Sequence, residues 1–202
     1  MILPIVQVGD PVLRQADRHL TPDEIRGGAI RKLIADMRET MNDAPGVGLA
    51  APQIGQSLQI AVIEDREEWL KDVPLEQLAE RERRPVPFHV IINPKITESS
   101  GGEVEFFEGC LSLRGFAAIV PRARRVRVEC LDERGERQII KAAGWYARIL
   151  QHEIDHLLGN IYIDRMHSRT FTSGDNFDKF WGGKSIADVR AELRSTKKST
   201  KK

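Results

Sequence analysis

The chain has 202 residues, of which 41% are hydrophobic and 30% are charged, and its formal net charge at pH 7 is +1. This length and composition fit one soluble globular domain with a single core. A net charge so close to zero argues against general nucleic-acid binding by charge alone. Two cysteines give no disulfide framework. We also expect no membrane contact and no secretory signal, because no apolar run approaches the length of a span and the first ten residues lack a basic region.

The first predicted helix begins at Thr21, a capping residue that is followed by Pro22 and Glu24. Apolar residues then recur at helical spacing, at Ile30, Leu33, Ile34, Met37 and Met41. We therefore expect a helix that packs on the core and carries no chemistry. The glycine-rich segment 46–55 is predicted to be irregular. It lacks the Lys-Ser/Thr ending of a phosphate-binding loop.

Short strands are predicted in the middle of the chain. Residues 59–64 and 90–94 are strand-like, and the charged stretch 66–84 between them is interpreted as a solvated insertion, with at most a short helix. Further short strands are expected at 95–98, 102–107, 116–120 and 125–131, and a turn at 132–136 joins the last of these to 137–142 as a hairpin.

A second long helix is predicted from residue 144 to 158, with Gly159 as its C-terminal cap. Many strands and two long helices indicate an α+β fold, with short, mostly antiparallel strands around this central helix. The helix contains the pattern H-E-x-x-H at residues 152–156.

The two histidines of this pattern, His152 and His156, project from one face of the helix and can reach a single metal ion. Glu153 lies beside the first histidine and can serve as a general base on water. Trp145 and Ile149 share the histidine face, either as core residues or as walls of an apolar pocket. The alternative is an amphipathic helix whose two histidines are merely partly exposed.

An open catalytic site needs a third protein ligand. Downstream of His156, neither His167 nor any of the acidic residues lies in a recognisable ligand motif. Upstream, Cys110 follows Gly109, which would let the backbone approach a metal closely. One sulfur and two imidazoles would suit zinc or ferrous iron, whereas an unligated Cys110 would be a small buried residue.

Three blocks now stand in order: 46–55 (GVGLAAPQIG), 108–112 (EGCLS) and 151–156 (QHEIDH). They resemble the signature motifs of peptide deformylase, and residues 7–14 resemble the N-terminal segment of that family. The resemblance covers about residues 5–170. Arg114 stands where proline is frequent in bacterial members, and the stretches 115–116, 144–145 and 169–171 are more similar to the organelle-type branch.

The resemblance implies a metal-dependent hydrolase that removes the N-terminal formyl group from formyl-methionine of nascent polypeptides and releases formate. Cys110, His152 and His156 would hold one divalent metal, expected to be Fe²⁺, with Zn²⁺ or Ni²⁺ in purified protein. Glu153 would carry the proton. The side-chain amide of Gln53 and the backbone N–H of Leu111 would stabilise the oxyanion.

The substrate is expected to lie as an added strand against Val47 and Gly48, with its methionine between Val47, Trp145 and Ile149. Glu108 and Asp155 are candidate partners of the ligating histidines, with Arg122 as counter-charge, although ordinary salt bridges explain them too. Core packing is expected for Cys130 and a structural role for His89.

Two other classes remain open at this point. A zincin-type metallopeptidase would hold its metal through a residue downstream of His156. A non-catalytic ribosome-associated protein could keep the fold without the activity. A thiolate ligand at Cys110 requires a reducing compartment, either the bacterial cytoplasm or an organelle if a transit peptide has been removed.

Residues 1–184 are expected to form the catalytic domain, and residues 185–202 a helix and a basic tail. Ile186, Val189 and Leu193 have helical spacing, and the chain then ends in Ser195–Lys202, with four lysines and no apolar residue. We expect this end to be disordered when free. It either aids solubility or binds ribosomal phosphate.

Overall fold

The computed structural model of the protein describes the backbone of residues 1–199 and the side chains of residues 1–193. The helices are α1 (Pro22–Arg26), α2 (Gly28–Asp43), α3 (Glu67–Leu70), α4 (Leu75–Glu80), α5 (Gly144–Leu157), α6 (Gly174–Asn176) and α7 (Ile186–Ser199). The strands are β1 (Gly48–Ala50), β2 (Ile60–Asp65), β3 (Val86–Cys110), β4 (Leu113–Leu131), β5 (Arg137–Ala143) and β6 (Thr172–Ser173). Among the described residues, no helix is both long enough and apolar enough to cross a lipid bilayer.

The strands form one sheet in the order β1-β2-β3-β4-β5, and β6 pairs with β4. All of these pairings are antiparallel. The α+β prediction with antiparallel strands is therefore confirmed. The turn between β3 and β4 is tight, with Cys110 opposite Leu113, so Cys110 stands at the end of its strand.

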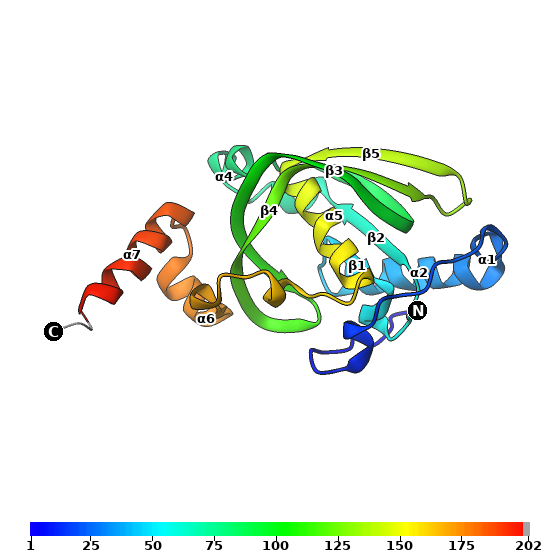
Figure 1. The fold of residues 1–202 in the computed structure, drawn as a ribbon, viewed down its shortest axis with the longest axis horizontal. Coiled ribbons are helices and arrows are strands. Elements are labelled where there is room, and N and C mark those ends of the chain that lie inside the picture. The colour runs from blue at the N-terminus through cyan, green and yellow to red at the C-terminus, as the bar shows by residue number, and fades with distance from the viewer. Residues whose placement is uncertain (200–202) are drawn as a thin grey trace.

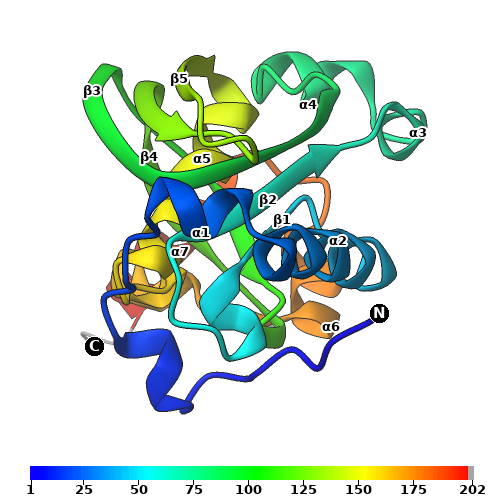
Figure 2. The same ribbon diagram turned by 90° about the vertical axis from the view of Figure 1, so that its right-hand side faces the viewer.

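Helix α5 occupies the middle of the molecule, surrounded by the strands (Figure 1). Its apolar residues Ile149, Leu150 and Ile154 are buried in one core cluster with sheet residues that include Ile91 and Val128. A second cluster joins α2 to β1 and β2. Figure 2 shows α2 beside these two strands and α3 and α4 together at the edge of the molecule. The rigid core thus fixes the helix that bears H-E-x-x-H.

The first predicted helix is divided into α1 and α2. The capping box of Thr21 and Glu24 forms as expected, but Gly27 has extended backbone dihedrals and ends α1. Glycine is a poor residue for a helix interior, and a Cβ at Gly27 would lie 2.9 Å from the carbonyl oxygen of Glu24. The apolar repeat belongs to α2, where Met37 and Met41 are fully buried.

The prediction of short strands is wrong for the middle of the chain, where 90–94, 95–98 and 102–107 are parts of the 25-residue strand β3. Strand β4 likewise combines two predicted strands. Gly101 and Gly102 have positive φ, and register shifts occur near them, so the strand bends without ending. The segment 46–55 is also more regular than expected, because it contains β1 and the 3-10 helix η2 (Ala51–Ile54).

The C-terminal helix is longer than the apolar pattern predicts. Ser185 accepts a hydrogen bond from the backbone N–H of Asp188 and caps α7, which continues to Ser199. Once a helix is nucleated, each further residue adds a hydrogen bond, and lysine is a good helix former. The expected disorder of the tail is therefore wrong through Ser199, and residues 200–202 lie outside the described part.

Candidate metal centre and active-site cavity

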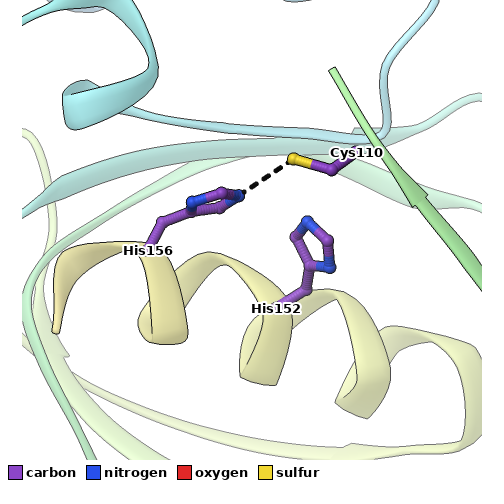
Figure 3. Close-up of side chains that lie close together, drawn as sticks. All are labelled: Cys110, His152 and His156. Atoms are coloured by element: carbon purple, nitrogen blue, oxygen red, sulfur yellow. Dashed lines mark hydrogen bonds between the residues drawn. The ribbon is translucent and has the colours of Figure 1, made fainter. Parts of the chain in front are cut away.

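Cys110, His152 and His156 come together although the cysteine lies more than forty positions from the histidines in the chain (Figure 3). One ligand atom of each lies within 4.8 Å of the others, and Cys110 Sγ is 3.2 Å from His156 Nε2. Helix α5 supplies both imidazoles from one face, and the end of β3 supplies the sulfur. No acid downstream of His156 belongs to such a group in the described part of the chain.

The donor set and the orientation of His152 both fit a divalent metal. One sulfur with two imidazoles is the donor set of soft or borderline ions such as zinc and ferrous iron. His152 Nδ1 is 3.0 Å from Glu108 Oε2, so its Nε2 remains for a metal, as is usual for ligating histidines. Burial lowers the pKa of His156 well below its usual range and keeps that imidazole neutral, as ligation requires.

Glu108 connects His152 to a buried network of charges. Its carboxylate accepts hydrogen bonds of 3.0 Å from Arg122 and one of 2.5 Å from Arg148. Burial alone would raise the pKa of Glu108, but the hydrogen bond with His152 and the charge of Arg122 hold it well below its usual range. Glu108 is therefore a carboxylate, and it fixes the orientation of the His152 ring.

Asp155 lies on the far side of this network. It accepts hydrogen bonds from Arg122 and from Arg165, and no contact joins it to a ligating imidazole in the described residues. Of the two predicted partners of the histidines, the structure therefore brings only Glu108 to a ligand.

Arg148 was missed by sequence reasoning. It is 2% exposed and also donates to the backbone carbonyls of Val104 and Val120. The sequence does contain one indication of its role. Arg148 lies one turn before His152, so it places a charge on a helix face that is otherwise apolar. Such a charge requires a buried partner, and Glu108 provides it.

Nine of the ten predicted site residues line one cavity of about 510 Å³. They are Val47, Gly48, Gln53, Cys110, Leu111, Trp145, Ile149, His152 and Glu153. His156 is not one of the lining residues and is 1% exposed.

Gln53 is oriented by its surroundings. Its Oε1 accepts from the backbone N–H of Ala50 at 2.8 Å, which directs Nε2 toward Cys110 Sγ at 3.5 Å and Ser112 Oγ at 3.3 Å. The amide thus presents a hydrogen-bond donor beside the candidate metal ligands. Ser112, which is 1% exposed, was not among the predicted site residues.

The carboxyl group of Glu153 is enclosed. The residue is 3% exposed, and its Oε2 has no hydrogen-bond partner among the described residues. Burial raises the pKa of Glu153 to about 7. A group with such a pKa can accept and return a proton near neutral pH.

The position of Glu153 depends on Gly48. A Cβ at Gly48 would lie 2.2 Å from Glu153 Oε1, and the glutamate would have to move by about 1 Å to restore van der Waals contact. We expect Gly48→Ala to lower turnover about 100-fold while the protein still folds, since a 1 Å misplacement can have that effect. Turnover and thermal unfolding would be measured beside Gly28→Ala, whose Cβ meets no atom within 4 Å. Equal turnover in both variants would contradict this account.

One further cysteine and two further histidines of the sequence analysis lie outside this cavity. Cys130 is 7% exposed and belongs to the core. His89 bridges Tyr146 and the carbonyl of Pro87, and His167 pairs with Glu105. Arg114, by contrast, lines the cavity together with Phe116.

Comparisons with known proteins identify the family of this chain. The family model for polypeptide deformylase matches residues 2–171. The chain is 49% identical over 174 residues to peptide deformylase 1A, chloroplastic/mitochondrial, of Arabidopsis thaliana, covering 86% of this chain and 65% of that protein. It is 45% identical over 183 residues to peptide deformylase 3 of Streptomyces avermitilis, covering 89% of this chain and 78% of the relative.

Solved structures give the same result. A class I type b peptide deformylase from Acinetobacter baumannii with Met-Ala-Ser bound has a TM-score of 0.73 and 30% identity, covering 82% of this chain and 99% of the other. The chain spans just under two thirds of the length of two plant relatives, at 65% and 63%. The family is metal-dependent, and the sulfur–imidazole cluster is a group that could hold a metal ion. The chain belongs to the polypeptide deformylase family.

Proposed function

We propose that this chain hydrolyses the N-terminal formyl group of formyl-methionine on nascent polypeptides and releases formate. The observation that carries the proposal is a Cys-His-His cluster whose Cys110 and His152 line one cavity with Glu153 and Gln53. Family membership supports the same reaction.

Cys110, His152 and His156 would hold one divalent metal, with ferrous iron as the native ion and zinc or nickel in purified material. When bound, the ion supplies Lewis acidity and lowers the pKa of water at the site toward neutrality. Glu108 keeps the His152 ring in place through its 3.0 Å contact with Nδ1.

Proton transfer falls to Glu153. It takes a proton from the attacking water and delivers one to the amine that leaves as the C–N bond of the formamide breaks. Gln53 Nε2 and the backbone N–H of Leu111 donate to the oxygen that becomes negative in the transition state. Removing one such donor costs about 2.7–4 kcal/mol.

The substrate backbone has a place beside β1. This strand stands at the end of the sheet order, so an extended peptide could pair along it at Val47 and Gly48. The formyl group would then enter the cavity toward Glu153.

The decisive experiment is to measure formate and free amine from formyl-Met-Ala-Ser under anaerobic conditions with ferrous iron. We expect equal amounts of both products. Cleavage of an internal peptide bond would favour a zincin-type peptidase, and binding without either product would favour a non-catalytic protein.

The apolar walls of the cavity predict selectivity for the first residue. Methionine is unbranched and polarizable, and it suits a slot formed by Val47, Trp145 and Ile149. We expect formyl-Met peptides to exceed formyl-Ala peptides in kcat/KM by about 10–200-fold and norleucine to be nearly equivalent. Equal kcat/KM values for formyl-Met and formyl-Asp peptides would show that these three residues do not form a methionine-binding slot.

We further propose that residues 1–184 suffice for the reaction and that the basic tail, residues 195–202, directs the protein to the ribosome. The lysines of residues 195–202 would displace counterions from ribosomal RNA. That segment contains four lysines and no acidic residue.

Removal of residues 195–202 should weaken ribosome co-sedimentation at low ionic strength and leave short-peptide turnover unchanged. The effect should disappear at moderate ionic strength, since binding by counterion release falls steeply with salt. Identical co-sedimentation of both forms at low salt would refute the targeting role and leave solubility as the function of the tail.

A reducing compartment suits a thiolate ligand and ferrous iron. Relatives include chloroplastic/mitochondrial and bacterial proteins. We propose that the chain works where formylated chains are made, in the bacterial cytoplasm or in an organelle.

A further inference from the structure

The charged segment 66–84 ends against the first turn of α5. Helix α4 lies near the upper end of α5 in Figure 1, and the chain that follows α4 turns inward. There the carbonyl oxygen of Arg81 accepts a hydrogen bond of 2.9 Å from the backbone N–H of Trp145. Helix α5 has no side-chain cap at Ala143, so this segment supplies an acceptor to one of the N–H groups that a helix leaves unpaired in its first turn.

The contact is close and well anchored. A Cβ at Gly144 would lie 2.4 Å from the Cβ of Glu82 and 2.6 Å from the carbonyl oxygen of Arg81, so the approach requires glycine. Glu82 has a φ of 47°, a backbone conformation that residues other than glycine rarely adopt. Arg83 donates two hydrogen bonds of 2.8 Å to the buried carboxylate of Asp65, at the end of β2. The end of the segment is thus fixed against α5.

The guanidinium group of Arg81 packs on the indole of Trp145. It lies 5.1 Å from the centroid of that ring and 5.7 Å from the centroid of Phe106. A guanidinium over an aromatic face is attracted by the charge distribution of the ring. The Nε of Arg81 is buried and has no hydrogen-bond partner among the described residues, so the aromatic rings are its neighbours there.

Trp145 stands between Arg81 and the active-site cavity. Trp145 lines the cavity, whereas Arg81 is not one of the lining residues and faces a separate hollow. Arg81 can therefore affect a bound peptide only through the indole. Ile149, which shares the proposed methionine slot, is 4% exposed and fixed in the core, but the indole lies at the start of α5, where segment 66–84 packs on it.

We propose that Arg81 is a positioning residue of the methionine slot, because its guanidinium group holds the indole of Trp145 in the orientation that contacts the first side chain of the formylated peptide. This inference rests on the proposed function. It gives segment 66–84 a role in substrate affinity, although the segment carries none of the residues that perform the reaction.

The first test measures kcat and KM of the full-length, metal-loaded protein with formyl-Met-Ala-Ser and formyl-Ala-Ala-Ser. Arg81→Ala should raise KM for the methionine peptide about 5-fold, the weight of one cation–π contact. Its kcat should be unchanged, because the indole contacts methionine in both the ground state and the transition state. KM for the alanine peptide should also be unchanged, since alanine has no side chain beyond Cβ. A damaged fold would instead affect both peptides.

Arg81→Lys tests the nature of the contact. Lysine keeps the positive charge but carries it on a flexible stem without a planar group, so it stacks less well on an indole. We expect this variant to recover part of the preference for methionine that Arg81→Ala loses.

The second test follows the indole itself. The chain has three tryptophans, so replacing Trp69 and Trp181 by phenylalanine leaves Trp145 as the only one. In the structure its Nε1 is buried. In this background, Arg81→Ala should increase the quenching of Trp145 fluorescence by acrylamide, because the indole becomes less enclosed.

Arg84→Ala is the matched control. Arg84 lies in the same segment, is exposed and is not one of the arginines that lie over Trp145. This variant should leave both KM values and the quenching at wild-type levels. Thermal unfolding of Arg81→Ala should stay near that of the wild-type protein, because the backbone contact to α5 and the Arg83–Asp65 ion pair remain.

The outcomes separate this inference from the proposed function. If no formylated peptide releases formate, the proposed function fails and this inference fails with it. If formyl-Met-Ala-Ser is hydrolysed but Arg81→Ala leaves its KM unchanged, only this inference is overturned. An equal rise in KM for both peptides would also overturn it, because Arg81 would then act on the fold and not on the methionine slot.

Discussion

Replacing Glu153 by glutamine should lower kcat for a formyl-Met peptide by about 10²–10⁴-fold, the usual contribution of a positioned acid–base group. Glutamine keeps the shape of the side chain but cannot accept the proton of the attacking water. Glu153 is 3% exposed, and glutamine fits the same space, so we expect the fold to be unchanged. Glu153 does not belong to the cluster of Cys110, His152 and His156, so we expect the metal content to be unchanged as well. Formate release and metal per chain would be measured on the same sample.

The exposed Glu133, on the turn before β5, provides the control. Glu133→Gln should match the wild-type protein in both measurements. Turnover by Glu153→Gln near the wild-type rate would exclude the proton-transfer role. Loss of metal from Glu153→Gln would instead identify Glu153 as a ligand.

The parts of the site that the sequence predicts are those encoded by local spacing. Two histidines four positions apart on a helix must share a face, and α5 places His152 and His156 in this way. The capping box at Thr21 is local in the same sense and forms. Cys110 could be assigned only through the motif around it, because nothing local to residue 110 specifies its approach to α5.

Other features depend on tertiary contacts that no local pattern contains. The requirement for Gly48 arises only where β1 passes Glu153, and the division of the first helix arises from the backbone at Gly27. The rings of Phe107 and Phe177 are in contact and both line the cavity. Because the two residues are seventy positions apart, the sequence around one gives no indication of its contact with the other. The sequence predicts several short strands in place of β3 because glycines usually indicate turns. In the structure these glycines lie within one strand that pairs with β4 along its length.

The metal centre gives the last prediction. Cys110→Ser should lower metal affinity by more than the 10–100-fold typical of changes to partners of the ligands, since it removes a ligand itself. Turnover should fall with metal content. Serine oxygen is a hard donor and a poor substitute for thiolate toward ferrous iron or zinc. X-ray absorption of the metal-loaded wild-type protein should show one sulfur at about 2.3 Å with imidazole nitrogens, and the sulfur should be absent from Cys110→Ser.

Cys130 is the matched control, because it is the other cysteine of the chain. It is buried in β4 and does not belong to the cluster of Cys110, His152 and His156, and burial raises the pKa of its thiol to about 11. Cys130→Ser should keep the sulfur signal, the metal and the activity, with some loss of thermal stability from the buried hydroxyl. If the sulfur signal survives in Cys110→Ser and disappears in Cys130→Ser, the metal is not held by the cluster on α5. With iron loaded, activity should also fade in air, because both thiolate and ferrous iron oxidise.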